Sequence, residues 1–251
     1  MLAIWFHTVF GFTSYHHLRT LGPWRTALFA LYLLLVGVLV FTLYFAWQIH
    51  RQLPTFIDKL PALTFEQGHL IGPQEKTTVS IPKTPYVLIF DASAKNPPTA
   101  QEFVDQKILA FISGNQLYMP SVAGVNAQTL PEKLSGDLTP QTIHTYEPTI
   151  RGFLQSAAFF GAFFIMGIFL LFSTLLAAAI IFFWRGIKQA SISRGTLWRW
   201  AIFLQGPALI LWLVQLFYGV PLFTFALFIL FNIYVQQIFN TLPYSRGKYV
   251  A

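Results

Sequence analysis

The hydrophobic residues of this chain fall into long uncharged runs on both sides of a more polar middle segment. The runs at residues 26–47, 153–184, 200–217 and 220–239 contain no Asp, Glu, Lys or Arg. A helix of about 20 apolar residues crosses a hydrocarbon core of about 30 Å. The pattern therefore predicts four transmembrane helices.

Two of these segments carry further information. As a helix, residues 153–184 would measure roughly 48 Å, so this span must tilt, kink or protrude from the bilayer. The last two spans are joined at Tyr218-Gly219, a link so short that they form an antiparallel hairpin.

At the amino terminus, the apolar stretch 2–12 is too short to cross the membrane. We therefore interpret residues 1–25 as an interfacial helix followed by a cytoplasmic segment.

Residues 48–152 have a different texture, with Pro, Gly, Asp and Lys between short apolar stretches. This spacing is typical of strands and turns. Gly68 and the Gly114-Asn115 pair occupy tight-turn positions and predict two hairpins. The predicted strands are 62–65, 69–71, 78–81, 86–90, 108–112 and 116–119.

Two short helices are also expected in this middle segment. Thr99 with Glu102 three residues later has the spacing of a capping box and predicts a helix over 99–106. A second helix begins at Thr139, with Pro140 in its first turn, and is expected to continue through Pro148. The predicted fold is a membrane all-α bundle of four helices with a small β-rich α+β extracytoplasmic domain inserted between helices 1 and 2.

The distribution of charge predicts the orientation. All nine acidic residues lie between Asp58 and Glu147, whereas the sixteen basic residues divide equally between 51–151 and the rest of the chain. The outlying cations occupy the amino-terminal segment, the basic loop 185–199 and the tail 240–251, which an even number of crossings places on one side. Lys and Arg are enriched in cytoplasmic loops. We therefore predict that both termini are cytoplasmic and residues 48–152 are outside.

Composition removes several classes of function. Only 10% of residues are charged and 55% are apolar, which indicates lipid as the solvent. The cations stand singly at the ends of apolar runs, so a membrane-flanking role fits them better than nucleic-acid binding. The chain has no cysteine and therefore no disulfide, thiolate metal site or thiol nucleophile.

Amides are the informative polar groups inside the predicted spans. Asn232 and Gln236 lie four residues apart on one helix face, and Gln205 falls level with them if the hairpin turns at Gly219. The three side chains are predicted to hydrogen-bond across the helix pair, which favours a stabilising role. The alternative is a polar pocket for a ligand.

Small residues at a spacing of four predict close helix packing in the second span. The pairs are Ala157 with Gly161 and Ser173 with Ala177. Small side chains let two backbones approach closely in lipid.

We find no catalytic, cofactor or metal motif in the sequence. The spans contain no ionisable residue away from their ends, which weighs against proton-coupled transport and intramembrane proteolysis. In the middle segment, an enzyme would have to use Glu66, His69, Asp91 or His144. We interpret both histidines as surface residues, because no nucleophile motif or metal signature accompanies them.

One local sequence carries a family resemblance. Residues 60–70 read Leu-Pro-Ala-Leu-Thr-Phe-Glu-Gln-Gly-His-Leu. This resembles the Leu-Pro-x-Phe-x-Ile-x-Asn-Gly-x-Leu signature of the bacterial domain-of-unknown-function family 1189, one of the Yip1-like membrane proteins; Leu63 and Gln67 depart from that signature. The Ile89-Phe90-Asp91 string and residues 114–118 are also similar. The resemblance implies a polytopic membrane protein without known catalytic residues, some relatives of which are encoded beside maltodextrin-uptake genes.

The expected function is a non-enzymatic accessory or scaffold of the bacterial cytoplasmic membrane. Its expected partners are membrane lipid and either another envelope protein or a second copy of the chain. The alternative is a transport or lipid-handling protein with a path along the amide-bearing hairpin.

Overall fold

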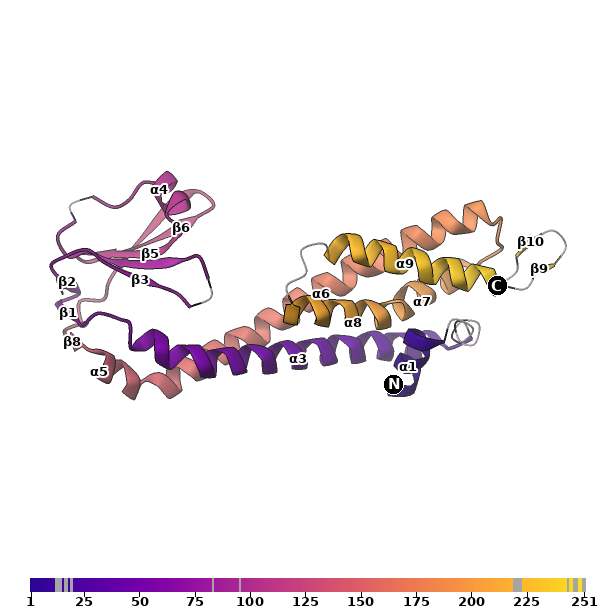
Figure 1. The fold of residues 1–251 in the computed structure, drawn as a ribbon, viewed down its shortest axis with the longest axis horizontal. Helices are drawn as coiled ribbons and strands as arrows, with labels where there is room; N and C mark the ends of the chain where they lie inside the picture. Colours follow the sequence, from indigo (N-terminus) through magenta and orange to yellow (C-terminus); the bar gives the residue numbers. More distant parts are fainter. Residues whose placement is uncertain are drawn as a thin grey trace. The chain divides into compact units, whose positions relative to one another are not determined.

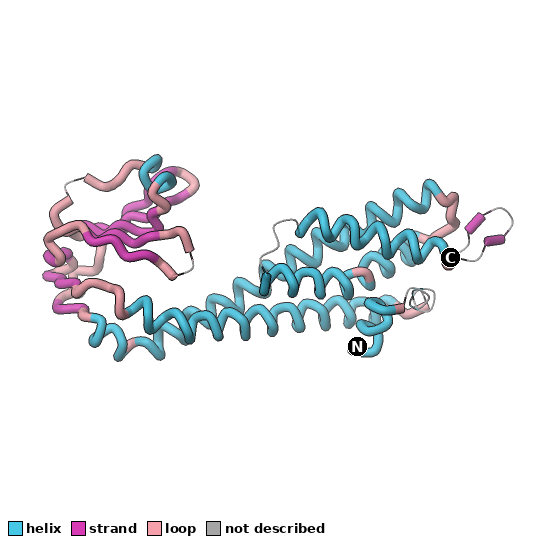
Figure 2. Tube along the Cα trace, viewed as in Figure 1, coloured by secondary structure: helices cyan, strands magenta, loops and turns pink. Residues whose placement is uncertain are grey.

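The computed structural model describes residues 1–11, 15, 18, 20–82, 84–94, 96–218, 223–242, 244, 245, 248 and 249. The chain divides into two compact units. A helical unit contains Met1–Phe45 and Ser156–Ala251, and a sheet-rich unit contains Ala46–Gln155. Figure 2 shows this division in secondary structure, because all but the shortest strands lie in the second unit.

Four helices among the described residues are long and apolar enough to cross a membrane. They are α3 (Pro23–Ile57), α6 (Glu147–Ile187), the segment Arg194–Tyr218 and α9 (Phe223–Asn240). Both α3 and α6 extend past the apolar runs that predicted them, so the middle segment begins and ends in helix. The predicted turn at Gly219 lies outside the described residues.

The third of these segments is two helices, α7 (Arg194–Phe203) and α8 (Gln205–Tyr218), with Leu204 as the cap between them. Proline explains the break: Pro207 has no N–H to donate to the carbonyl of Phe203, and its ring would clash there. Placing Pro207 in the first turn of α8 removes both costs. Helix α7 also starts earlier than predicted, because the Ser193 hydroxyl accepts a hydrogen bond from the Thr196 N–H and caps it.

The amino-terminal helix α1 (Leu2–Phe10) packs against α8 in the helical unit (Figure 1). The Trp5 indole donates a 3.1 Å hydrogen bond to the Gly206 carbonyl, and the Tyr234 hydroxyl donates to the Val9 carbonyl. A Cβ atom at Gly206 would contact the Thr8 hydroxyl and lie 3.1 Å from Trp5 Cδ1 and 3.2 Å from Thr8 Cβ. Glycine at 206 therefore permits this close approach.

The core of the helical unit collects large apolar side chains from several helices. Phe29 and Leu33 of α3 are buried with Met166 and Ile181 of α6. The same core includes Trp200, Phe203, Phe231 and Phe239 from α7 and α9.

The sheet-rich unit contains two sheets. The larger has the order β3-β4-β5-β6-β7, in which only the β4–β5 pairing is parallel. The smaller has the order β2-β1-β8. The strands are β1 (Leu63–Glu66), β2 (His69–Gly72), β3 (Thr77–Ser80), β4 (Val87–Phe90), β5 (Ile108–Ser113), β6 (Gln116–Ser121), β7 (Gly124–Thr129) and β8 (Gly136–Leu138).

Helix α4 (Ala100–Asp105) connects the parallel strands β4 and β5, and its Phe103 packs on the sheet with Ile89 and Phe111. A second core of this unit joins Leu63, Phe65 and Leu70 of the small sheet to Val79 and Phe90 of the large one. The large sheet is therefore packed on both faces.

Most local predictions for this unit are confirmed. All six predicted strands are present within two residues at each end, and both predicted hairpins form. The Thr99–Glu102 capping box is also present, with both of its hydrogen bonds. Gln67 and Gly68 both have positive φ, as the tight β1–β2 turn requires.

The expected continuous helix through Pro148 is wrong. Helix α5 (Pro140–Thr145) starts at its Thr139 cap as predicted but ends at Tyr146, and α6 begins at Glu147. A continuous helix would drive the Pro148 ring into the His144 carbonyl. The break places Pro148 in the first turn of a new helix instead.

Gly206 tests the docking of α1. The Gly206→Ala variant should be less stable by about 1–3 kcal/mol, because the added methyl group overlaps Thr8 and displaces α1. Thermal unfolding in mild detergent measures the loss. The control is Gly161→Ala, where a Cβ meets nothing within 4 Å and a helical glycine is replaced, so stability should be unchanged or higher. Equal effects in the two variants would contradict the close contact.

Candidate functional site

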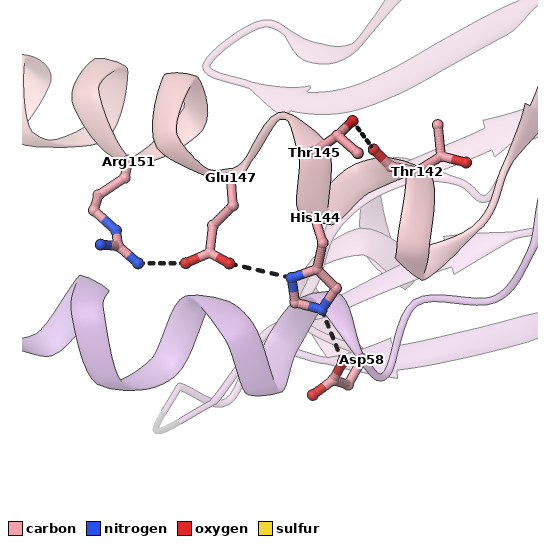
Figure 3. Close-up of polar contacts among 6 residues, drawn as sticks. All are labelled: Asp58, Thr142, His144, Thr145, Glu147 and Arg151. Carbon is pink, nitrogen blue, oxygen red and sulfur yellow. Dashed lines mark hydrogen bonds and ion pairs between the residues drawn. The ribbon is translucent and has the colours of Figure 1, made fainter.

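A chain of ionisable side chains joins the end of α3 to α5 and α6 within the sheet-rich unit (Figure 3). His144 Nε2 lies 2.9 Å from Asp58 Oδ1, and His144 Nδ1 lies 3.1 Å from Glu147 Oε2. The other carboxylate oxygen of Glu147 accepts from Arg151 Nη2. We call Asp58, His144, Glu147 and Arg151 the His144 cluster.

Helix geometry explains how these side chains meet. His144 lies in the last turn of α5, and Glu147 is the first residue of α6. A cation near a helix C-terminus and an anion near an N-terminus both interact favourably with the backbone dipoles. Arg151 follows Glu147 at i+4, a spacing that places both side chains on one helix face. Asp58 comes directly after α3.

An apolar contact lies beneath the cluster. Ile49, Leu53 and Ile57 of α3 repeat at a spacing of four and are buried against three side chains of α5 and α6, namely Ile143, Ile150 and Leu154. The His144 cluster therefore adds ion pairs next to the apolar contact between α3 and the helices α5 and α6.

The electrostatics favour a charged imidazole. Hydrogen bonds to Asp58 and then to Glu147 raise the pKa of His144 above its ordinary value of 6.5. A histidine between two carboxylates can hold and orient a proton, but Arg151 also neutralises Glu147. The arrangement is that of an ion-paired fastening between helix ends.

His144 lies at the surface, as the sequence predicted, but it is ion-paired with two carboxylates, which the sequence analysis did not predict. Its side chain is 34% exposed, and both ring nitrogens have partners. The His144–Glu147–Arg151 spacing of three and four was the available signal. Asp58 is distant in the sequence, and only the fold brings it to the ring.

The other ionisable candidates of this unit lie in different hollows. Glu66 and His69 face each other across the tip of the β1–β2 hairpin, both exposed, and line an open depression of about 440 Å³. Asp91 lines another hollow with Lys76 and Glu102, and it accepts hydrogen bonds from the Ser93 N–H and hydroxyl. The structure does not bring the four candidates Glu66, His69, Asp91 and His144 into one site.

The predicted amides of the helical unit have different partners from those expected. Gln205 is 2% exposed; its Oε1 accepts from the Ser173 hydroxyl of α6 at 2.5 Å, and its Nε2 donates to the Ala201 carbonyl at 2.8 Å. Asn232 Oδ1 accepts from the Trp184 indole of α6 at 3.2 Å. Both amides therefore reach α6 rather than each other, and Gln236 is exposed on α9.

Of the small residues predicted to pack closely on α6, one pair is buried and the other is not. Ser173 and Ala177 are fully buried, whereas Ala157 is exposed and a Cβ at Gly161 would meet nothing within 4 Å. The buried positions in that part of the helix are Ala158 and Ala162, one residue further on. A close contact that was not predicted occurs at Gly37 of α3, where a Cβ would lie 2.6 Å from Met166 Cε.

The His144 cluster predicts a pH dependence of stability. Because the pKa of His144 is raised on folding, its contribution is fully present below about pH 6.5 and is lost as the pH rises through the folded-state value. We expect the unfolding temperature of the wild type to exceed that of His144→Gln more at about pH 5 than at about pH 9. Thermal melts of both chains at the two pH values measure this difference.

The control is His69→Gln, which replaces an exposed histidine on β2 of the same unit. It should retain the wild-type pH profile. A His144→Gln chain with an unchanged profile would show that protonation of His144 contributes nothing to folding.

The amide contacts predict unequal effects of two matched substitutions. Gln205→Leu removes the bond to Ser173 and should lower the free energy of unfolding by about 0.6–1.7 kcal/mol, the range for such bonds between membrane helices. Gln236→Leu replaces an exposed amide and should stay within about 0.5 kcal/mol. Unfolding in mixed micelles of rising SDS content measures both. Similar losses would contradict the assignment of Gln205 as the interhelical contact.

Comparison with known proteins gives a match to one family model. No curated protein and no solved structure matches the chain. A family model does match, and it covers residues 5–239, which is nearly the whole chain and includes both units. The chain belongs to the family described as protein of unknown function (DUF1189).

Proposed function

We propose that this chain is a multi-pass accessory or scaffold protein of the bacterial cytoplasmic membrane. It engages another envelope protein through its sheet-rich unit and its membrane helices, and it catalyses no reaction itself. Its four long helices span the bilayer, both termini are cytoplasmic, and residues 48–152 are outside.

The observation that carries membrane insertion is the apolar outer surface of the long helices. Along α3, Leu31, Leu35, Leu39 and Leu43 are 47–61% exposed and recur at every fourth residue. On α6, exposed aromatic side chains include Phe160, Phe164 and Phe172. Soluble monomers rarely expose apolar patches of this extent, whereas such stripes suit contact with lipid tails.

Charge supports the orientation. Residues 1–45 and 156–251 of the helical unit contain eight Lys and Arg but no Asp or Glu, whereas the sheet-rich unit contains all nine acidic residues. The rule that positive loops remain in the cytoplasm assigns the sheet-rich unit to the outside.

Engagement of a partner is supported by the variety of polar surface in the sheet-rich unit. Open polar depressions of about 440 and 550 Å³ both include Gln67 and His69, at the tip of the β1–β2 hairpin. Backbone hydrogen bonds join this tip to its neighbours: Leu70 N–H donates to the Gly114 carbonyl and Gly68 N–H to the Leu134 carbonyl. A surface held in this way is suited to recognition, because the hairpin tip loses little conformational entropy when a partner binds.

The transport or lipid-handling alternative receives less support from the contacts of the amides. Gln205 uses both its oxygen and its nitrogen within the helical unit, and the Asn232 oxygen is bonded to Trp184. Two of the three predicted amides are therefore engaged in helix packing, and Gln236 is the exposed one. The observed contacts favour the stabilising role.

Photo-crosslinking in native membranes tests the proposal. A crosslinking amino acid at Val104, which is 69% exposed on α4, should capture a defined envelope protein. The matched probe at Ile187, 56% exposed at the end of α6, lies on the side assigned to the cytoplasm and should capture it less than the Val104 probe does, because the sheet-rich unit makes the main contact. Capture at Ile187 but not at Val104, or a lone monomer in every mild-detergent purification, would count against the proposal.

Topology reporters supply the control for that experiment. Fusions at the carboxyl terminus and near Asn96 should report opposite sides of the membrane. If they report the same side, the proposed orientation is wrong. The two crosslinking probes can then no longer be assigned to opposite sides of the membrane.

A further inference from the structure

The two edges of the large sheet differ in how they are protected. Among the described residues, β3 and β7 each pair on one side only, β3 with β4 and β7 with β6. Edge β3 is four residues long and lies between Lys76 and Pro82. Edge β7 is six residues long, and Asn126, Ala127, Gln128 and Thr129 are all exposed. An open strand edge offers a row of backbone N–H and C=O groups to another strand.

Edge β7 lacks the usual barriers to pairing. Natural sheets protect their edges with charged side chains, proline, bulges or short strands. No Asp, Glu, Lys or Arg occurs between Lys107 and Glu132, and β7 itself contains no proline. Its pairing with β6 runs without a register shift from Gly124 to Thr129. The strand is therefore regular up to its open side.

The side chains of β7 are distributed over both faces of the sheet. Ala127 is opposite Tyr118, which in turn is opposite Phe111, so these three share the face covered by α4. Asn126 and Gln128 project from the other face, since neighbouring residues alternate along a strand. An added strand would extend both faces without meeting a charge.

We propose that β7 pairs antiparallel with β7 of a second copy of this chain, so that one sheet continues across two subunits. With the two-fold axis at Ala127, Ala127 lies opposite itself and Asn126 lies opposite Gln128 of the second copy, so a charge next to the axis would lie diagonally across from its own copy. The uncharged β7 avoids this repulsion. Asn126 and Gln128 also fit a second copy, because an amide carries donors and an acceptor and can bond to another amide.

Membrane confinement completes the argument, and this step rests on the membrane insertion proposed above. Pairing of two six-residue strands buries little surface compared with a stable soluble interface. Two copies held in one bilayer meet at a much higher effective concentration. The pairing is therefore expected in membranes and in the full chain.

Single cysteines test the pairing directly, because the natural chain has none. Directly opposed Cα atoms in antiparallel pairs lie about 4.5–5.5 Å apart, a separation that a disulfide spans. Oxidation of membranes that contain Ala127→Cys should give a covalent dimer on a non-reducing gel. The matched control, Thr78→Cys, places an exposed cysteine on edge β3 and should give at least about tenfold less dimer.

A second variant excludes chance collisions. Adding Asn126→Lys to Ala127→Cys places like charges across the two-fold axis and should abolish the dimer, while thermal unfolding checks that the unit remains folded. The proposal is overturned if Ala127→Cys gives no dimer, if Thr78→Cys gives as much, or if the cysteine at 127 joins a different protein. None of these results affects capture by the Val104 probe, so failure here is distinguishable from failure of the scaffold function.

Discussion

The contact between the end of α3 and the start of α6 closes the sheet-rich unit. A domain inserted between two long helices must return its chain to the place where it left, and Ile49, Leu53 and Ile57 provide that closure by packing on Ile143, Ile150 and Leu154. The His144 cluster fastens the same contact at its polar end. Strand β8, directly before α5, pairs with β1, the first strand after α3. The first and last parts of the unit are thus joined both in helix and in sheet.

Local signals in the sequence predicted the strands and turns whose causes are local. Gly68 and Gly114 mark hairpins because their positive φ is required at the turn itself. Strands β7 and β8 were missed because their apolar signal is weak: β7 alternates only Val125 and Ala127 with polar residues, and β8 is three residues long. Gly136-Asp137-Leu138 becomes a strand only through β1, and β7 only through β6. Pairing partners distant in the sequence supply the hydrogen bonds there, and no window of residues contains that information.

In the helical unit, the length and composition of the apolar runs do not determine how each helix is rotated about its axis. They predicted four helices, but the rotation of each helix depends on its neighbours. Moving from Ala157 to Ala158 turns the contact face by about 100°, so a stripe of small residues that fits by spacing lies on the wrong side. The same holds for the amides: Gln205, the first residue of α8, meets Ser173 of α6 rather than the amides of α9.

The cations of the helical unit follow a different rule from those of the sheet-rich unit. Arg151 finds Glu147 one helical turn away, whereas residues 1–45 and 156–251 offer no Asp or Glu side chain at all. Lys188, for example, donates to the amide oxygen of Asn240 at 3.4 Å. The side chains of this unit therefore carry a net positive charge, because they include eight Lys and Arg and no carboxylate. In the orientation proposed above, this excess of positive charge keeps the loops of the helical unit in the cytoplasm, so the same absence of acidic residues determines both the charge of the unit and its proposed side.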